Sequence, residues 1–444
     1  MAFCGYPVAT TRAPGMGRSM SESPDNQQAT PANAVTVLCP VCDMRVPVGA
    51  HCVICGIALP GNPESLPPIP EGDRGRVLKV VFYPLATLAV LLLLGIVLGN
   101  APSLTGLLLV VAAALLPAVI YAAIVIRLDH YEPEPPAWML AALLWGAIGA
   151  TSLTIITSLS LSLGSPADRE FIRTVAAAPL IEESFKAIAL VVLTYGFRHE
   201  LDNTLDGLLY GGLIGIGFAF TENILYFERS YSWWGISGLG ISFLMRAVIG
   251  GWGHCVWTGI VGAGIGWARG RYRKGFIRFV VPVIAFVVAV SLHYIWNIVA
   301  FITEGYAGST SQLIRWELIS ATLVIFPALV LLYVVARLSR KRQMQIIKQQ
   351  LKDEVTTGFL TPGEYAVLTS DDLRKRSLRR AKTIDPTVAT EQRRFFNTAV
   401  ELAFLKNHVA MGEHLDQRRI ALLARYRRSL ADLRPNLPDL GSAA

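Results

Sequence analysis

Residues 205–227 read LDGLLYGGLIGIGFAFTENILYF, and this stretch limits the fold to one class. Roughly twenty consecutive apolar residues carry a helix across a bilayer, and the stretch is that long. Glycines at 207, 211 and 215 recur every four residues, a spacing that lets a neighbouring helix approach closely. Packing does not explain Glu222 and Asn223, because a carboxylate in this setting needs a proton, a cation or a metal.

Similar apolar stretches recur along much of the chain. Its 444 residues are 53% hydrophobic and 16% charged, with a mean hydropathy of +0.46, which is too apolar for an ordinary soluble enzyme. We expect an all-α polytopic membrane protein with about eight transmembrane helices. They are predicted at about 79–99, 104–126, 137–163, 176–197, 205–227, 241–268, 277–302 and 316–338.

The basic residues predict an orientation. Lys and Arg concentrate at the edges of the apolar runs and in the C-terminal region, so the net charge of +8 is best explained by membrane topology. With eight spans, the basic loops fall on one side and both termini are predicted to be cytoplasmic, as in a multi-pass plasma membrane protein of a bacterium. No nucleic acid partner is expected, because the sequence lacks interleaved aromatic and basic residues and any base-reading motif.

Four of the six cysteines form two C-x2-C pairs, Cys39 with Cys42 and Cys52 with Cys55. This pattern is typical of a zinc ribbon, in which four thiolates hold Zn²⁺ tetrahedrally. Two disulfides in an exported segment are the alternative, although a disulfide within each pair would be strained. A zinc site also implies a reducing compartment, in agreement with a cytoplasmic N-terminus.

The remaining segments complete the predicted domain organisation. Residues 1–34 are expected to be disordered because they are polar and contain few large apolar side chains. No signal-peptide pattern is present there. The zinc-ribbon-like module is placed at 35–60, a Pro-rich linker at 61–77, the membrane domain at 78–338 and a helical cytoplasmic tail at 339–444.

Charged residues inside the expected spans carry the candidate chemistry. Each costs about 2.5–3.5 kcal/mol on insertion scales, so each needs a purpose. The fourth span contains Glu182, Glu183 and Lys186. Glu182 and Lys186 share a helix face, so a buried ion pair is the simplest structural explanation. The second carboxylate favours a functional site, since one lysine does not neutralise both.

Two further spans add histidines. His254 is followed by Trp257 and Thr258, and His293 by Trp296 and Asn297. The four-residue spacing puts Asn297 on the same helix face as His293. Counting ~1.5 Å per residue from the expected outer ends, Glu182, Glu222, His293 and Asn297 lie within roughly 8–14 Å of that surface and His254 at roughly 20 Å, depths that allow them to meet. The candidate site residues therefore are Glu182, Glu183, Lys186, Glu222, Asn223, His254, His293 and Asn297.

Together these motifs resemble those of PrsW-type intramembrane proteases. They are Glu-Glu-x-x-Lys at 182–186, Gly-Phe-Ala-x-x-Glu-Asn at 217–223 with Tyr226, His-x-x-Trp-Thr at 254–258, His-x-x-Trp-Asn at 293–297, and the acidic Tyr131-Glu-Pro-Glu-Pro135 stretch. The family belongs with CAAX prenyl proteases and bacteriocin-processing membrane proteins. The resemblance implies hydrolysis of peptide bonds in membrane-anchored protein substrates, with anti-sigma factors as the associated example.

Two mechanisms are open at this point. In the first, Glu182 is the general base on a water that His254 orients, and His293 and Asn297 donate to the oxyanion. In the second, His254 and His293 bind Zn²⁺ with Glu182 or Glu222, and the remaining glutamate is the base. The absence of an H-E-x-x-H helix slightly favours the first. Lys186 keeps a neighbouring carboxylate ionised in both.

Two other classes of function are alternatives to the protease. A proton- or cation-coupled transporter also uses buried Glu and His residues. The sequence shows no obvious inverted repeat of broken helices, which disfavours a transporter. A non-catalytic scaffold that recruits partners through the ribbon and the tail is weaker, because it has no need for isolated intramembrane glutamates.

Overall fold

The computed structural model describes the chain in segments with short gaps between them. They are residues 36–38, 45–47, 87–99, 103–128, 131, 134–163, 171–196, 201–271, 275–411, 417–438 and 440. The four ribbon cysteines lie outside the described residues. On either side of Cys39 and Cys42, strands β1 (Thr36–Leu38) and β2 (Arg45–Pro47) pair antiparallel, with Val37 opposite Val46.

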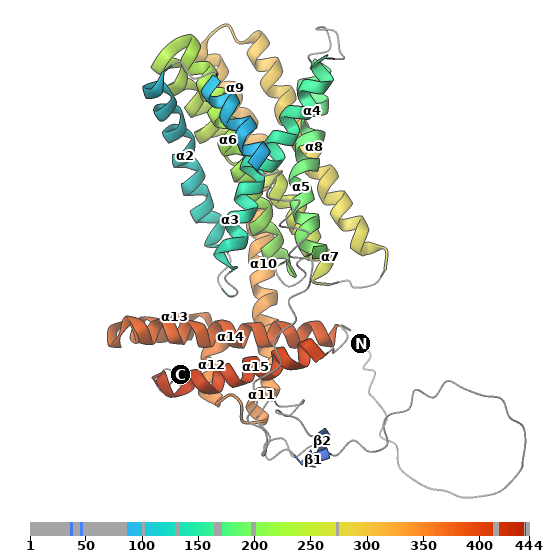
Figure 1. Cartoon of the computed structure of the whole chain (residues 1–444), viewed down its shortest axis with the longest axis vertical. Coiled ribbons are helices and arrows are strands. Elements are labelled where there is room, and N and C mark those ends of the chain that lie inside the picture. Colours follow the sequence, from blue (N-terminus) through green and yellow to red (C-terminus); the bar gives the residue numbers. More distant parts are fainter. Residues whose placement is uncertain are drawn as a thin grey trace, which may run out of the picture.

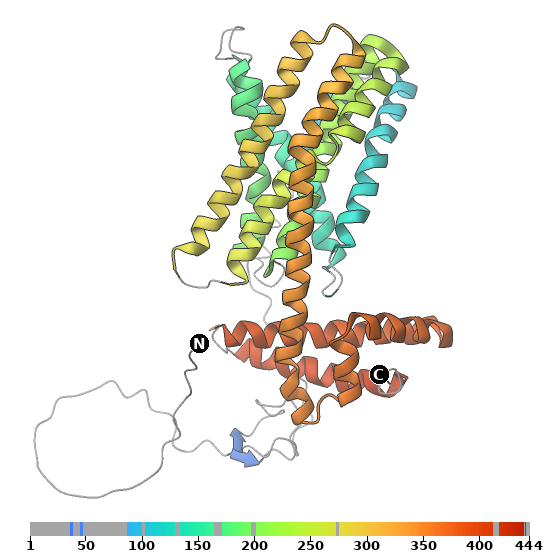
Figure 2. The ribbon, with the colours of Figure 1, turned by 180° about the vertical axis from the view of Figure 1, so that it is seen from behind.

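A helical bundle forms the larger part of the molecule (Figures 1 and 2). A helix at Thr87–Gly99 comes first among its described helices. Further along come α2 (Leu104–Ile126), α3 (Pro136–Leu144), η1 (Trp145–Ala150), α4 (Thr151–Leu163), η3 (Ile172–Ala177), α5 (Ala178–Gly196), α6 (Thr204–Phe243), η4 (Leu244–Ile249), α7 (Gly253–Arg269), α8 (Ile277–Tyr306), α9 (Thr310–Ser320), η5 (Ala321–Ile325) and α10 (Phe326–Gln350). Of these, η1, η3, η4 and η5 are π-helical. Every described element of the bundle is therefore a helix, as expected for the all-α class.

Five helical runs of the described residues are long and apolar enough to cross a membrane, against the eight spans expected. One of them, Thr204–Arg269, covers two expected spans because the chain reverses at Trp234 and Gly235. Gly235 has a φ of +58°, a conformation that favours glycine. Helix α5 carries Glu182, Glu183 and Lys186, which lower its hydropathy, and Thr87–Gly99 is shorter than a full crossing. The number eight stays a prediction.

Helices α6 and α7 form the centre of the bundle. In the most apolar part of Thr204–Arg269, 78% of residues are buried, against 28% in α2 and 17% in α8, which expose their apolar side chains at the periphery. The core includes Tyr210 from α6 and Trp257 from α7. Apolar side chains on the outside and a packed centre are the pattern expected of a bundle surrounded by lipid.

Glycines bring α6 and α7 into backbone contact, as the four-residue spacing predicted. A Cβ added to Gly207 would lie 2.0 Å from the Gly262 carbonyl oxygen, and one added to Gly211 would lie 2.4 Å from that of Thr258. One added to Gly215 would lie 2.1 Å from the carbonyl oxygen of His254. Only glycine fits at these positions, and the last contact fixes the distance between α6 and a candidate site residue.

The C-terminal region forms a second helical layer. It contains α11 (Lys352–Thr356), α12 (Pro362–Leu368), α13 (Asp371–Ile384), α14 (Pro386–Ala410), α15 (Gln417–Leu433) and the 3₁₀ turn η6 (Arg434–Asn436). Pro362 and Pro386 occupy the first turns of their helices, where proline is tolerated. A core that includes Phe395 and Phe396 also takes in Ile347 of α10. Helix α10 therefore continues from the bundle into this layer without a break at residue 338.

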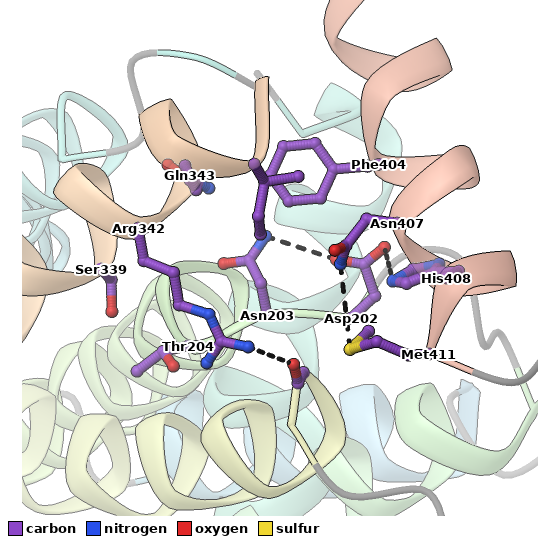
Figure 3. Close-up of a pocket in the computed structure, with 12 residues that line it drawn as sticks. Asp202, Asn203, Thr204, Ser339, Arg342, Gln343, Phe404, Asn407, His408 and Met411 are labelled. Atoms are coloured by element: carbon purple, nitrogen blue, oxygen red, sulfur yellow. Dashed lines mark hydrogen bonds and ion pairs between the residues drawn. The ribbon is translucent and has the colours of Figure 1, made fainter. Parts of the chain in front are cut away.

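The junction between the two layers contains a small cavity (Figure 3). His408 of α14 pairs with Asp202 at 3.3 Å, and Arg342 of α10 donates to the Gly270 carbonyl oxygen at 2.8 Å. Both partners from the bundle lie at helix ends, just before α6 and just after α7. The cavity and its polar lining therefore belong to the joint between bundle and tail, and the candidate site residues lie elsewhere.

We predict that Gly215→Ala lowers the stability of the folded protein by about 1–3 kcal/mol, because the added methyl group overpacks the α6–α7 contact. The measurement is the thermal unfolding midpoint of the purified protein in detergent. The matched control is Gly240→Ala, beyond the reversal at Gly235, where an added Cβ meets nothing within 4 Å. Equal midpoints for the two variants would contradict the close-contact argument.

Candidate active site

Six of the eight sequence-predicted site residues meet in one cluster inside the bundle. Helix α5 contributes three of them, and α6, α7 and α8 contribute one each. They are Glu182, Glu183, Lys186, Glu222, His254 and His293. These side chains come from four helices, so the cluster exists only when the helices are packed.

Lys186 lies at the centre of the cluster. Its Nζ donates to Glu183 Oε1 at 2.8 Å and to Glu182 Oε2 at 3.3 Å. The same Nζ lies 2.8 Å from His254 Nδ1 and 3.8 Å from the centre of the Phe218 ring. The side chain is fully buried, so the ammonium is stabilised only by these neighbours.

Glu183 is the most enclosed carboxylate of the cluster, with no exposed side-chain surface. Besides Lys186, it accepts a hydrogen bond from Thr258 Oγ1 at 2.9 Å and pairs with His293 Nδ1 at 3.2 Å. Because both of its carboxylate oxygens have hydrogen-bond partners, Glu183 is suited to hold Lys186, Thr258 and His293 in place. The expected ion pair on α5 is therefore real, and it is part of a larger network.

The imidazole rings of His254 and His293 are oriented in the same way, each between two carboxylates. His254 Nε2 lies 2.8 Å from Glu222 Oε2, and His293 Nδ1 pairs with Glu183. The other nitrogen of each ring lies near Glu182 Oε2, at 3.9 Å for His254 Nδ1 and 3.8 Å for His293 Nε2. Each ring is thus oriented by a carboxylate on one side and faces Glu182 with its second nitrogen.

Aromatic side chains pack against this pair of histidines. Trp257 stacks on His293 with ring centroids 4.0 Å apart and planes within 13°, and it meets His254 edge-on at 5.0 Å. Phe218 lies 5.1 Å from His254 on another side. On the α5 side, Trp145 Nε1 donates to the Phe185 carbonyl oxygen at 3.0 Å. The rings therefore restrict the imidazoles to a narrow range of orientations.

The structure adds Arg246, which the sequence analysis did not single out. It comes from η4, where Arg246 Nη2 lies 2.7 Å from Glu222 Oε2 and Nε donates to Asn223 Oδ1 at 3.2 Å. Its guanidinium also lies over the Tyr226 ring at 3.7 Å. An arginine inside the expected 241–268 span is as costly as a glutamate, and this cost was the signal available in the sequence.

Asn223 and Asn297 take different positions from those of the six clustered residues. Asn223 is buried and holds Arg246, so it positions the guanidinium beside Glu222. Asn297 is half-buried and lies one helical turn beyond His293 on the same face of α8, as the spacing predicted.

The donor set fits a metal ion. Glu182, His254 and His293 each offer a ligand atom, and the three atoms lie within 4.8 Å of one another. Two imidazoles and one carboxylate are a familiar ligand set for catalytic zinc, with a fourth position left for water. Glu222 and Glu183 bond the outer nitrogens of the two rings, as carboxylates do around metal-bound histidines. Lys186 Nζ approaches His254 Nδ1, the nitrogen that faces Glu182, so a metal ion bound to this nitrogen would have to displace the ammonium.

An apolar helical bundle with buried carboxylates, imidazoles and a lysine defines a polytopic membrane protein with an intramembrane polar site. Residues 134–335 match the PrsW family of intramembrane metalloproteases, a range that contains every site residue named above. Over these residues the chain is therefore similar to the PrsW family.

Three proteins named Protease PrsW are similar to the chain. The Oceanobacillus iheyensis protein is 29% identical over 218 residues, which cover 48% of this chain and 87% of that protein. The Geobacillus kaustophilus protein is 28% identical, with 42% and 79% covered, and the Bacillus subtilis protein 26% identical, with 26% and 53% covered. No solved structure matches the chain. With these relatives and its apolar helices, the chain is a bacterial multi-pass membrane protein.

We predict that Lys186→Met destabilises the fold by about 3–5 kcal/mol, because it leaves Glu182 and Glu183 without the ammonium that offsets their burial. Combining it with Glu183→Gln should recover part of the loss, since a neutral amide replaces one carboxylate. Thermal unfolding of both variants in detergent measures the difference. If the double variant were no more stable than the single one, the ammonium would not be the compensating charge.

Proposed function

We propose that this chain is an intramembrane peptidase that hydrolyses peptide bonds of membrane-anchored protein substrates. The observation that carries the proposal is the geometry around Glu182, which two separately oriented imidazoles face from 3.8 and 3.9 Å. A water molecule held among these three groups has a carboxylate as proton acceptor and two imidazoles to fix its direction. The PrsW match independently supports hydrolysis of a peptide bond.

The exposure of the charged groups suggests a division of roles. Glu183 and Lys186 are fully buried, and they hold Glu182 and His293 in position. Glu222 and Arg246 keep 18% and 28% of their side chains exposed, so this edge of the cluster is the side from which a substrate can approach. Arg246 is then the cation nearest an arriving carbonyl group, and its guanidinium can stabilise the developing oxyanion.

The reaction has a metal-dependent and a metal-free version, and both use Glu182 and His254. In the metal version, Glu182, His254 and His293 would hold the ion, which would supply a water of lowered pKa, while Glu222 and Glu183 orient the imidazoles. In the metal-free version, Glu182 accepts the proton from water directly, and His254 orients that water. The family description and the ligand set support the first version, which reverses the slight preference drawn from the sequence.

We predict that Glu182→Gln lowers the rate of substrate cleavage by about 10²–10⁴-fold in either version, because the amide neither accepts a proton nor binds a metal well. The assay uses purified protein and a panel of single-span membrane substrates. The control is Glu228→Gln, which alters another buried carboxylate of α6 that makes none of the cluster contacts and should leave cleavage unchanged. Full activity in Glu182→Gln would overturn the proposal.

The metal content of the same samples separates the two versions. Replacing Cys39, Cys42, Cys52 and Cys55 by serine removes the expected ribbon zinc from the full chain. One metal ion per chain that remains in this protein and is lost in its His293→Ala form supports a metallopeptidase. Cleavage by a protein that contains no metal supports the glutamate version. Nothing in the comparisons or in the described residues favours the transporter alternative.

We also predict that Arg246→Gln lowers kcat by about 10²–10³-fold, the usual effect of removing one oxyanion donor. KM should change much less, because this stabilisation arises in the transition state. Arg229→Gln, which alters an arginine shortly before the reversal at Trp234 and Gly235, is the control and should retain activity. A change confined to KM would assign Arg246 to substrate binding.

A further inference from the structure

The C-terminal layer is held firmly at the ends of the membrane helices. Arg340 of α10 donates to the Leu128 carbonyl oxygen just after α2, and Arg342 donates to that of Gly270 just after α7. His408 pairs with Asp202 just before α6 (Figure 3). Arginines directly after apolar spans, such as Arg127 and Arg269, mark the boundary between membrane and water. The layer therefore begins at the level of the lipid headgroups.

Helix α13 is docked beneath the bundle by Tyr131. The phenol of this nearly fully buried residue donates to a carboxylate oxygen of Asp371, and the Arg374 guanidinium lies 5.3 Å from the ring centre. Burial and the hydrogen bond to Asp371 raise the pKa of Tyr131, so the phenol keeps its proton. Figures 1 and 2 show α13 and α14 lying crosswise to α10 at the base of the bundle. Helix α13 thus runs along the membrane surface.

The exposed side of α13 is strongly basic. Its exposed cations are Lys375, Arg376, Arg379, Arg380 and Lys382, and its acidic residues are confined to the first turn. Lys375, Arg379 and Lys382 follow Asp371 at intervals of about one helical turn, so they lie on the same exposed side of α13 as Asp371, the residue that binds Tyr131. Among the described residues, none of these three has an acidic partner.

We propose that this basic side of α13 binds anionic lipid headgroups of the adjacent leaflet. Its charge is complementary to that surface, its axis runs along it, and the docking contacts keep it at headgroup level. A cationic side chain at an anionic membrane surface gains about fivefold in binding. A free acidic protein or a nucleic acid fits less well, because the lysines share a side of α13 with Asp371, which Tyr131 holds at the level where the membrane helices end.

Hydrogen–deuterium exchange of α13 tests the proposal on the full chain in lipid nanodiscs. Discs of neutral phosphatidylcholine are compared with discs that contain 30% phosphatidylglycerol. We expect exchange in α13 to slow by about fivefold for each engaged lysine in the anionic discs, because local opening must then break lipid contacts. Raising the salt concentration from 50 to 500 mM should remove the difference.

Two matched double variants of α13 locate the effect. Lys375→Gln with Lys382→Gln should remove most of the slower exchange and leave only the contribution of Arg379, whereas Arg376→Gln with Arg380→Gln removes the same charge from the other side and should retain it. Equal exchange in neutral and anionic discs would overturn the proposal. Equal loss of the slower exchange in both double variants would also overturn it. The same holds if exchange in α13 slows only when nucleic acid or acidic peptide is added to neutral discs. The exchange of the bundle helices reports whether each variant is folded.

Discussion

The membrane domain depends on the pairing of charges that hydrocarbon does not solvate. Lys186 is surrounded by Glu182, Glu183 and His254, and Glu222 is held between His254 and Arg246. An unpaired charge at this depth costs about 2.5–3.5 kcal/mol on insertion scales, and no helix of the cluster pairs all of its own charges. The contacts that build the candidate active site are therefore also contacts that assemble α5, α6, α7 and α8.

Glycine controls the precision of that assembly. The backbones of α6 and α7 touch at Gly207, Gly211 and Gly215, and the last of these contacts the carbonyl group of His254. The ring of His254 is consequently placed beside Glu222, and the reversal at Trp234 and Gly235 returns the chain so that η4 brings Arg246 to the same carboxylate. The glycine contacts thus set the distance between α6 and α7, and the long side chains of His254 and Arg246 reach Glu222 from α7 and η4.

Several hydrogen bonds and ion pairs connect the tail to the membrane domain. Tyr131 joins α13 to the loop after α2, and nearby Glu134 accepts a hydrogen bond from Tyr210 of α6 at 2.6 Å. Within the tail, the buried carboxylate of Glu354 is neutralised by Lys406 and Arg427. The acidic stretch at 131–135, which contributed to the family resemblance, therefore connects the tail to the helix that carries Glu222.

The sequence by itself determined the class of fold and most of the cluster. Uninterrupted apolar stretches permit only membrane helices, and Glu182, Glu222, His254 and His293 stood out because charged or polar side chains are costly inside such helices. Tertiary structure decided what each of them contacts: which carboxylate orients which imidazole, that Glu183 is enclosed, that Asn223 serves Arg246, and that Arg246 belongs to the site. Spacing along one helix fixes only which side chains share a face. The distances between helices depend on the glycine contacts and on the reversal at Gly235, and these exist only in the packed bundle.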